Sequence, residues 1–123
     1  MSIRVVIADD HPVVREGLRL KIESGGKDIA VVGEASDGQE VLEIVKTRPA
    51  DVAILDIVMP NMNGIDALKA IRKIDGRAKV IMCTAMGQKS MVIESIQSGA
   101  VDFIVKPFQP DRVLQTITKV VEG

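Results

Sequence analysis

Apolar and polar residues alternate along the chain in blocks of two kinds. One kind is a short, continuously apolar run rich in β-branched residues, which is typical of strands covered on both faces of a sheet. There are five such runs, at residues 3–8, 29–33, 52–55, 79–83 and 102–105. The pattern therefore predicts a five-stranded parallel sheet.

The blocks between these runs, and the block after the last run, have helical periodicity. Apolar residues recur there at intervals of three and four, so that each block presents one apolar stripe. The stripe of the last block consists of Val113, Leu114, Ile117, Val120 and Val121. The stripe of the fourth block is less apolar and consists of Met91, Val92, Ser95 and Ile96. We expect five amphipathic helices, of which the fourth has the weakest apolar face.

Capping and helix-breaking residues agree with this division. Asp37 precedes Glu40 by three residues, which is the spacing of a capping box at a helix start. Pro49 and Gly99 lie where the second and fourth helices are expected to end, and Pro110 suits a first helical turn. Strands that alternate with helices over short connections need crossovers, which place helices on both faces of an open sheet. The predicted fold class is α/β, doubly wound, in three layers.

Length, composition and charge limit the classes of protein to which the chain can belong. We expect a single domain over residues 1–123, because this length suits one compact core and is too short for two. No apolar run approaches the ~20 residues that span a bilayer, so no membrane partner is expected. The N-terminus shows no secretion leader, and the cytoplasm is the expected location. A net charge of −1, with acids and bases interspersed, argues against direct binding of nucleic acid.

Polar residues follow four of the five predicted strands, at the end where doubly wound sheets bind ligands. They are Asp9 and Asp10 after the first strand, Asp56 after the third, Thr84 after the fourth and Lys106 after the fifth. Each of them alone could be an ordinary turn residue. Three acids, a hydroxyl and a lysine at one edge of a sheet are better explained as a site.

The chemistry of such a site follows from its charges. Converging carboxylates repel one another unless a cation lies among them. Oxygen ligands favour Mg²⁺, which we expect at Asp9, Asp10 and Asp56, with the main-chain carbonyl near Val58 completing the shell. Magnesium bound in this way usually accepts a further oxygen from a phosphate group.

Phosphoryl transfer needs a nucleophile and neutralisation of the phosphoryl oxygens. The residues divide these roles between them. Asp56 is the candidate nucleophile, and its carboxylate would form an acyl phosphate. Lys106 and the hydroxyl of Thr84 would each bind one phosphoryl oxygen, while the metal would hold the third.

In this order the residues resemble those of two-component response-regulator receiver domains (CheY-like domains), over essentially the whole chain. The matching features are Asp9-Asp10, Asp56 in the segment 55–60, Gly64, Thr84-Ala85 and Lys106-Pro107. The resemblance implies a flavodoxin-like (βα)5 fold and Mg²⁺-dependent phosphorylation of Asp56 by a sensor histidine kinase or a small acyl phosphate. It also implies self-catalysed dephosphorylation, and therefore a signalling phosphoacceptor rather than a dedicated metabolic enzyme.

The resemblance further implies a switch. Thr84 is expected to move toward the phosphoryl group, and Phe103 on the fifth strand to rotate inward; a permanently buried Phe103 is the alternative. A downstream protein target is expected at the face of the fourth helix and fifth strand, with Met86 and Met91 as candidate contacts. The peptide bond between Lys106 and Pro107 is expected to be cis.

The two halves of the chain resemble different subfamilies. Residues 9–18 resemble the receivers of NarL-type transcription regulators, whereas residues 84–88 and 106–110 resemble stand-alone chemotaxis regulators. The sequence thus leaves open a stand-alone chemotaxis regulator, the receiver part of a two-domain DNA-binding regulator, and a mosaic or engineered origin.

Other function classes fit the residues less well. An aspartyl-phosphate hydrolase usually carries a second acid two residues after its nucleophile, where this chain has Val58. An FMN-binding flavodoxin needs a phosphate-cradling loop after the first strand, where this chain has Asp9 and Asp10. A receiver that binds partners without phosphorylation is disfavoured because all five site residues are present.

Several further residues have two interpretations. His11 adjoins the acidic pair, but next to Pro12 a position at the helix start on the rim of the site is favoured over a catalytic role. Cys83 lies within an apolar run and is interpreted as a buried, reduced thiol. The loop methionines could form a partner surface or pack internally; they are Met59, Met62, Met86 and Met91. In the family that the chain resembles, the positions of Val58 and Met86 flank the path of the attacking water, and two apolar residues there predict a long-lived acyl phosphate.

Overall fold

Five parallel strands pair in the order β2-β1-β3-β4-β5 in a computed structural model that describes residues 3–25, 28–48, 50–85 and 88–122. The strands are β1 (Ile3–Ala8), β2 (Ile29–Ala35), β3 (Val52–Asp56), β4 (Lys79–Thr84) and β5 (Asp102–Val105). The helices are α1 (Pro12–Glu23), α2 (Gly38–Thr47), α3 (Gly64–Ile74), α4 (Lys89–Gln97) and α5 (Pro110–Glu122). The strict alternation of strand and helix confirms the predicted doubly wound α/β fold.

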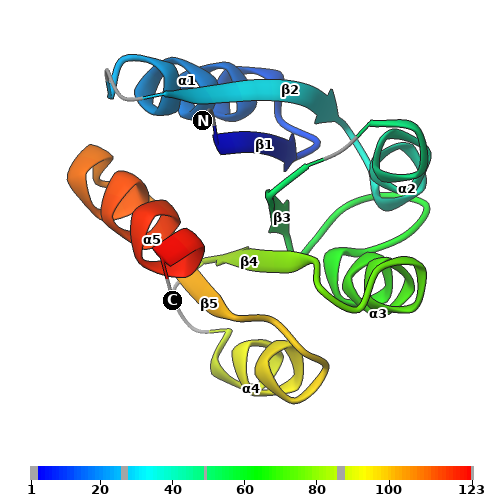
Figure 1. The fold of residues 1–123 in the computed structure, drawn as a ribbon. Helices are drawn as coiled ribbons and strands as arrows, with labels where there is room; N and C mark the ends of the chain where they lie inside the picture. The colour runs from blue at the N-terminus through cyan, green and yellow to red at the C-terminus, as the bar shows by residue number, and fades with distance from the viewer. Residues whose placement is uncertain (1–2, 26–27, 49, 86–87, 123) are drawn as a thin grey trace.

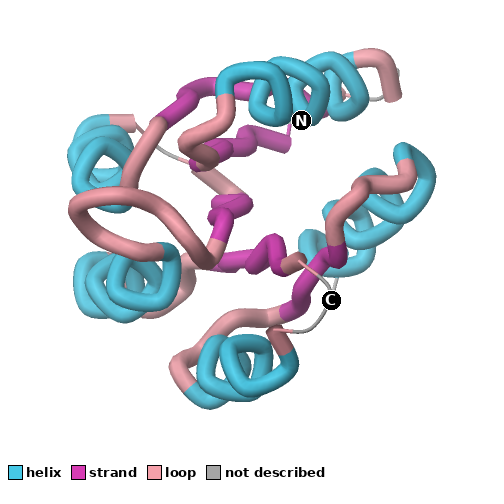
Figure 2. The backbone as a smooth tube through the Cα atoms, turned by 180° about the vertical axis from the view of Figure 1, so that it is seen from behind, coloured by secondary structure: helices cyan, strands magenta, loops and turns pink. Residues whose placement is uncertain are grey.

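Helices cover both faces of the sheet, as Figure 1 and the reverse view in Figure 2 show. Helices α1 and α5 contact each other on one face, while α3 contacts both α2 and α4 on the other. Successive residues of a strand point to opposite faces, so each buried strand supplies both cores. In β1, for example, Val5 and Ile7 belong to the core under α1 and α5, and Val6 and Ala8 to the core under α2 and α3. This is why the strands are continuously apolar.

The second strand is longer than the sequence pattern predicted. It continues to Ala35 because Glu34 and Ala35 pair with Ile7 and Ala8 of β1. The charged Glu34 ends the apolar run in the sequence, but main-chain pairing does not depend on side-chain polarity.

Helix ends follow the predicted caps where the structure describes them. Asp37 caps α2 by accepting a hydrogen bond from the main-chain N–H of Glu40 at 2.8 Å. Gly99, just after α4, has a φ of 111°, a conformation that favours glycine. Pro49 lies outside the described residues. Asn63 caps α3 by accepting from the N–H of Asp66 at 2.9 Å, a cap that the pattern had not indicated.

Helix α4 departs from its predicted apolar stripe. Ser95 is its one buried residue among those described, and its hydroxyl donates to the Met91 carbonyl at 2.8 Å. Met91 and Ile96 are exposed rather than packed on the sheet. The helix therefore turns apolar side chains toward solvent.

Strands β2 and β3 lie on opposite sides of β1, so the strand order changes direction at β1. This change of direction places a crevice beyond the carboxyl ends of β1 and β3. Asp9 follows β1 directly, and Asp56 is the last residue of β3. No described helix is both long and apolar enough to cross a membrane.

Candidate functional site

An ammonium group and three carboxyl groups meet beyond the carboxyl ends of the strands. Lys106, just after β5, places its Nζ 2.8 Å from Asp9 Oδ2 and 3.1 Å from Asp56 Oδ2. A carboxylate oxygen of Asp10 lies within 4.8 Å of carboxylate oxygens of Asp9 and Asp56. Asp9 and Asp56 are buried, so these charges act on one another with little screening by water.

The acidic residues fit a hard divalent cation. Ligand atoms from Asp9, Asp10, His11 and Asp56 all lie within 4.8 Å of one another. Asp10 Oδ1 is buried, and the ring Nδ1 of His11 lies beside it at 3.1 Å. Three carboxylates, with only one ring nitrogen beside them, suit Mg²⁺ better than a softer metal.

The ring of His11 lies at the rim of the acidic cluster. Its Nδ1 is 3.0 Å from Asp9 Oδ1 and 3.1 Å from Asp10 Oδ1, while most of its side chain is exposed. His11 is also the N-cap residue of α1, although its side chain makes no capping hydrogen bond. The predicted rim position is confirmed, and the contact with both acids is an addition to it.

The charges of the site shift one another's pKa values. Burial raises the pKa of Asp56; the hydrogen bond from Lys106 opposes this shift without cancelling it, and the charges of Asp9 and Asp10 add to it. Burial would also raise the pKa of Asp9, but hydrogen bonds from Lys106 and the His11 main chain hold it below its ordinary value. Burial would lower the pKa of Lys106, but its two carboxylate partners raise it. The negative charge of Asp56 is thus only partly compensated by Lys106, and a further positive charge nearby would stabilise it.

Thr84 lies at the end of β4, next to this cluster, but its hydroxyl is engaged elsewhere. Its main-chain carbonyl accepts from the N–H of Lys106 at 2.8 Å, which links it to the site. The hydroxyl is within hydrogen-bond distance of Gln88 Oε1 at 2.9 Å and of the Ala85 carbonyl at 3.1 Å. The structure therefore brings Asp9, Asp56 and Lys106 into direct contact, while the Thr84 hydroxyl is hydrogen-bonded to groups outside this set.

The loop after Asp56 is closely packed against the start of α3. The N–H of Gly64 donates to the Ile57 carbonyl at 2.8 Å. A Cβ at position 64 would overlap the main-chain carbonyl oxygen of Asp56 and lie 2.9 Å from Ile57 Cα. Only glycine permits this approach, which explains the residue. The side chain of Val58 on the same loop is 54% exposed.

Two residues near the site, Asn61 and Gln88, make side-chain contacts that the sequence pattern did not predict. Asn61 donates from its side chain to Asp37 Oδ2 at 2.7 Å and so ties the loop after β3 to the start of α2. Gln88 holds the Thr84 hydroxyl, as described above. The positive φ of 65° at Asn61 is typical of asparagine in loops, but its partner cannot be read from the sequence.

The remaining candidates are placed as follows. Phe103 is half-buried and packs against the core under α2 and α3. Met59 is buried in that core and Met62 packs against it, which favours internal packing for these two methionines. Met91 is exposed, and Met86 lies outside the described residues.

Two predictions about main chain and thiol are confirmed. The peptide bond between Lys106 and Pro107 is cis. Cys83 is free and buried, and burial raises the pKa of its thiol, which keeps it protonated and unreactive.

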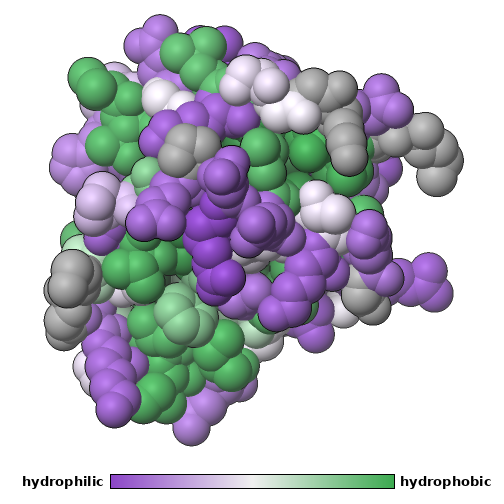
Figure 3. Space-filling model, turned by 90° about the vertical axis from the view of Figure 1, so that its left-hand side faces the viewer, coloured by the Kyte–Doolittle hydropathy of each residue, from purple (hydrophilic) through white to green (hydrophobic). Residues whose placement is uncertain are grey.

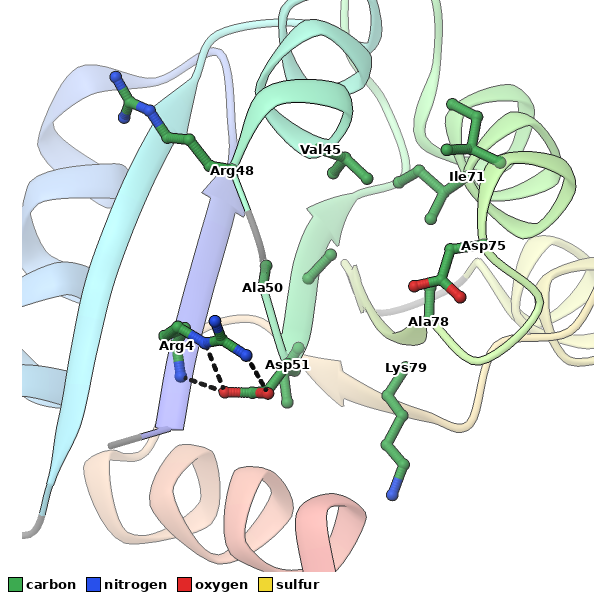
Figure 4. Close-up of a pocket in the computed structure, with 12 residues that line it drawn as sticks. Arg4, Val45, Arg48, Ala50, Asp51, Ile71, Asp75, Ala78 and Lys79 are labelled. Carbon is green, nitrogen blue, oxygen red and sulfur yellow. Dashed lines mark hydrogen bonds and ion pairs between the residues drawn. The ribbon is translucent and has the colours of Figure 1, made fainter. Parts of the chain in front are cut away.

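A cavity of about 250 Å³ lies at the opposite end of the sheet, and Figure 4 shows its charged lining. Asp51 accepts three hydrogen bonds from the main chain and guanidinium of Arg4, at 2.7, 3.2 and 3.1 Å. Arg48 and Lys79 donate to the carbonyls of Val32 and Val120, respectively. These charged groups are hydrogen-bonded to one another or to main-chain carbonyls and do not converge on the cavity. The candidate functional site is therefore the crevice around Asp56.

A doubly wound sheet with three acids and a lysine beyond its carboxyl ends defines an aspartate-centred class of α/β domain, whose acidic cluster could hold a metal ion. Residues 5–118 match the response regulator receiver domain. The chain belongs to this family.

Relatives of two kinds are similar to this chain. The chemotaxis protein CheY of Thermotoga maritima is 52% identical over 120 residues, which are 98% of each chain. A probable transcriptional regulatory protein NarL of Mycobacterium tuberculosis is 34% identical over 122 residues, which are 99% of this chain and 56% of that protein. Among solved structures, the response regulator domain of Thermotoga maritima CheB matches with a TM-score of 0.91 at 36% identity, covering 100% of this chain and 98% of that one. These matches confirm a CheY-like receiver with the flavodoxin-like fold.

Proposed function

We propose that this receiver domain accepts a phosphoryl group on Asp56 from a sensor histidine kinase. The observation that carries the proposal is the contact of Lys106 Nζ with both Asp9 and Asp56, in a cluster where carboxylate oxygens of Asp9, Asp10 and Asp56 lie within 4.8 Å of one another. This arrangement gathers a nucleophile, a fixed cation and a place for a second cation around one point. In a receiver domain, phosphoryl transfer is the chemistry that uses all three.

In the proposed reaction, a carboxylate oxygen of Asp56 attacks the phosphorus of a phosphohistidine. The phosphorus–nitrogen bond breaks, its electron pair stays on the imidazole, and the product is an acyl phosphate. Burial of Asp56 favours this step, because water does not shield the carboxylate. Lys106 keeps a donor directed at the oxygens of Asp56 and is positioned to bind a phosphoryl oxygen.

Asp9, Asp10, Asp56 and the main-chain carbonyl of Val58 would hold Mg²⁺ in this proposal. The bound ion would neutralise phosphoryl charge that three neighbouring carboxylates would otherwise repel. Lys106 alone offers one positive charge against three negative ones. The raised pKa of Asp56 agrees with a site short of positive charge.

The output proposed is a change in binding of a downstream protein at the face formed by α4 and β5. Thr84 and Phe103 would act as the switch. Exposed apolar residues gather here: Met91, Ile93, Ile96, Val101 and Val105. Figure 3 shows apolar side chains grouped in the lower part of one face, at the level of α4. The match to CheY over nearly its full length favours a chemotaxis partner in the cytoplasm, with a DNA-binding regulator as the second candidate.

The test is the intact mass of the protein after incubation with Mg²⁺ and a small acyl phosphate. Wild type should gain the mass of one phosphoryl group, and Asp56→Asn should gain nothing. Asp111→Asn, which changes an exposed carboxylate on α5, is the matched control and should behave as wild type. An equal gain in Asp56→Asn, or no gain in wild type with the acyl phosphate and with a phosphorylated histidine kinase, would overturn the proposal.

A further inference from the structure

The side chain of Gln88 makes an unusual pair of contacts at the start of α4. Its Oε1 accepts from the hydroxyl of Thr84 and from the main-chain N–H of Ala85, both at 2.9 Å. Gln88 occupies the N-cap position of α4, yet its side chain caps no N–H of that helix. The amide is thus directed at the end of β4 instead of at its own helix.

The orientation of this amide is fixed by its partners. A main-chain N–H can only donate, so the atom of Gln88 that faces Ala85 must be the oxygen. The Thr84 hydroxyl must then be the donor to Gln88, and it has only one proton to give. Because Thr84 is buried, water does not compete for that proton. The alternative acceptor for that proton, the Ala85 carbonyl at 3.1 Å, also lies outside the acidic cluster.

We infer that Gln88 is a positioning residue that restrains the Thr84 hydroxyl in the resting protein. The inference deepens the proposed function and rests on it, because a phosphoryl group on Asp56 would have to compete with Gln88 for the Thr84 proton. When the Thr84 hydroxyl donates to the phosphoryl group instead, the Gln88 side chain is released at the first turn of α4. Phosphorylation is thereby linked to the helix that carries the exposed apolar residues Met91, Ile93 and Ile96.

A restraint of this kind opposes activation, so removing it should favour the active state. A ligand that binds the active state better gains affinity by the factor by which the equilibrium shifts. The loss of one hydrogen bond predicts a gain of about 2- to 10-fold. The Ala85 N–H, which also loses its acceptor, is at an exposed residue where water can replace it.

The test uses beryllofluoride, which mimics an aspartyl phosphoryl group, in the presence of Mg²⁺. Gln88→Met keeps the length of the side chain without its acceptor and should bind the mimic about 2- to 10-fold more tightly than wild type. Gln88→Glu keeps an acceptor oxygen and should bind no more tightly than wild type. Gln97→Met, at the exposed far end of the same helix, is the control and should leave the affinity unchanged.

A double-mutant cycle separates the restraint from a general loosening of α4. In a Thr84→Val background there is no hydroxyl to release, so Gln88→Met should no longer increase affinity. The resting protein gives a second readout without any ligand: the hydroxyl proton of Thr84 should exchange with water more slowly in wild type than in Gln88→Met, as measured by NMR. Equal exchange, equal or weaker binding by Gln88→Met, or a gain that persists without the Thr84 hydroxyl would overturn the inference.

These outcomes are distinct from failure of the proposed function. If wild type takes up the phosphoryl group and Gln88→Met is indistinguishable from it, only the role of Gln88 is overturned. If wild type neither takes up the phosphoryl group nor binds beryllofluoride, the proposed function is overturned, and the competition for Thr84 with it.

Discussion

The side-chain amide of Asn61 donates to Asp37 Oδ2 at 2.7 Å, and the other carboxylate oxygen of Asp37 accepts from the N–H of Glu40 at 2.8 Å. One buried carboxylate therefore caps α2 and also holds the loop that follows Asp56. A main-chain hydrogen bond from Gly38 to the Met62 carbonyl, at 3.0 Å, runs between the same two segments. The start of α2 is thus a fixed support for the loop beside the site.

Asn61→Gly should lower the stability of the fold without disturbing the backbone at this position. Glycine tolerates the φ of 65° at residue 61, so the change removes only the bond to Asp37. We expect the Tm at pH 7 to fall by about 2–5 °C. Asn61→Ala should cost more, because alanine disfavours a positive φ. An Asn61→Gly protein as stable as wild type would contradict this role of Asn61.

The effect of Asn61→Gly should depend on pH. The Glu40 N–H and the Asn61 amide hold the pKa of Asp37 below its ordinary value. A carboxyl with a lowered pKa stabilises the fold at neutral pH, and this contribution is lost as pH falls through its folded pKa. The difference in Tm between wild type and Asn61→Gly should therefore shrink in acid. Thermal melts between pH 7 and pH 3 measure it, and a difference that grows in acid would refute the argument.

Gly64→Ala should damage both the fold and the site. The new methyl group would overlap the carbonyl oxygen of Asp56, which belongs to a buried strand and has no room to move. We expect a loss of about 3 kcal/mol in the free energy of unfolding, measured by denaturant titration.

Gly17→Ala is the matched control for this substitution. Gly17 lies within α1, and nothing lies within 4 Å of its would-be Cβ. Alanine there should stabilise the helix by about 0.5–1 kcal/mol, because glycine is the poorer helix former. Equal effects of the two substitutions would show that crowding at Asp56 is not what requires glycine at position 64.

Much of this fold is predictable because strands that are buried on both faces of the sheet are continuously apolar in the sequence. The apolar runs marked all five strands, and the polar residues that ended them marked Asp9, Asp56 and Lys106 as one site. This works because parallel strands end at a common edge, whatever the details of side-chain packing. Lys106 and Asp9 are separated by 97 positions in the sequence, but this shared edge and the long lysine side chain bring Lys106 Nζ to 2.8 Å from Asp9 Oδ2.

The features that sequence could not supply depend on loop and helix-end geometry. In the sequence, Gln88 looks like any other polar residue. Its hydrogen bond with Thr84 depends on its position as the N-cap residue of α4, next to the end of β4. The outward position of Ile96 has a similar origin: a helical period shows that a stripe exists, but the packing of the helix decides which part of it is covered.

Asp56→Asn should stabilise the protein at pH 7 in the absence of metal ions. Burial raises the pKa of Asp56, so its charge is disfavoured in the fold, and stability falls as pH rises through that pKa. An uncharged amide of the same shape removes this penalty, and the Tm should rise by about 2–5 °C. Added Mg²⁺ should then raise the Tm of wild type more than that of Asp56→Asn, since one proposed ligand charge is gone. A lower Tm for Asp56→Asn without metal would show that the ion pair with Lys106 outweighs the cost of burial.

Val58→Asn should shorten the lifetime of the acyl phosphate. Val58 lies two residues beyond Asp56, and its exposed side chain has no group that could orient an attacking water. Met86, the other residue predicted to flank the path of the water, lies outside the described residues. An asparagine amide at position 58 could hold a water in line with the phosphorus, and we expect hydrolysis to be roughly 3- to 10-fold faster, less than full general-base catalysis supplies.

The decay is measured by removing the phosphodonor and following the intact mass with time. Val101→Asn is the control, because Val101 is exposed to a similar degree, 47% against 54%, and its N–H pairs with Val80 near the amino end of β4, away from the site. It should decay at the wild-type rate, which separates an effect on the attacking water from the general cost of a polar substitution. If Val58→Asn decayed no faster than wild type, access of water to the phosphorus rather than its orientation would limit the lifetime.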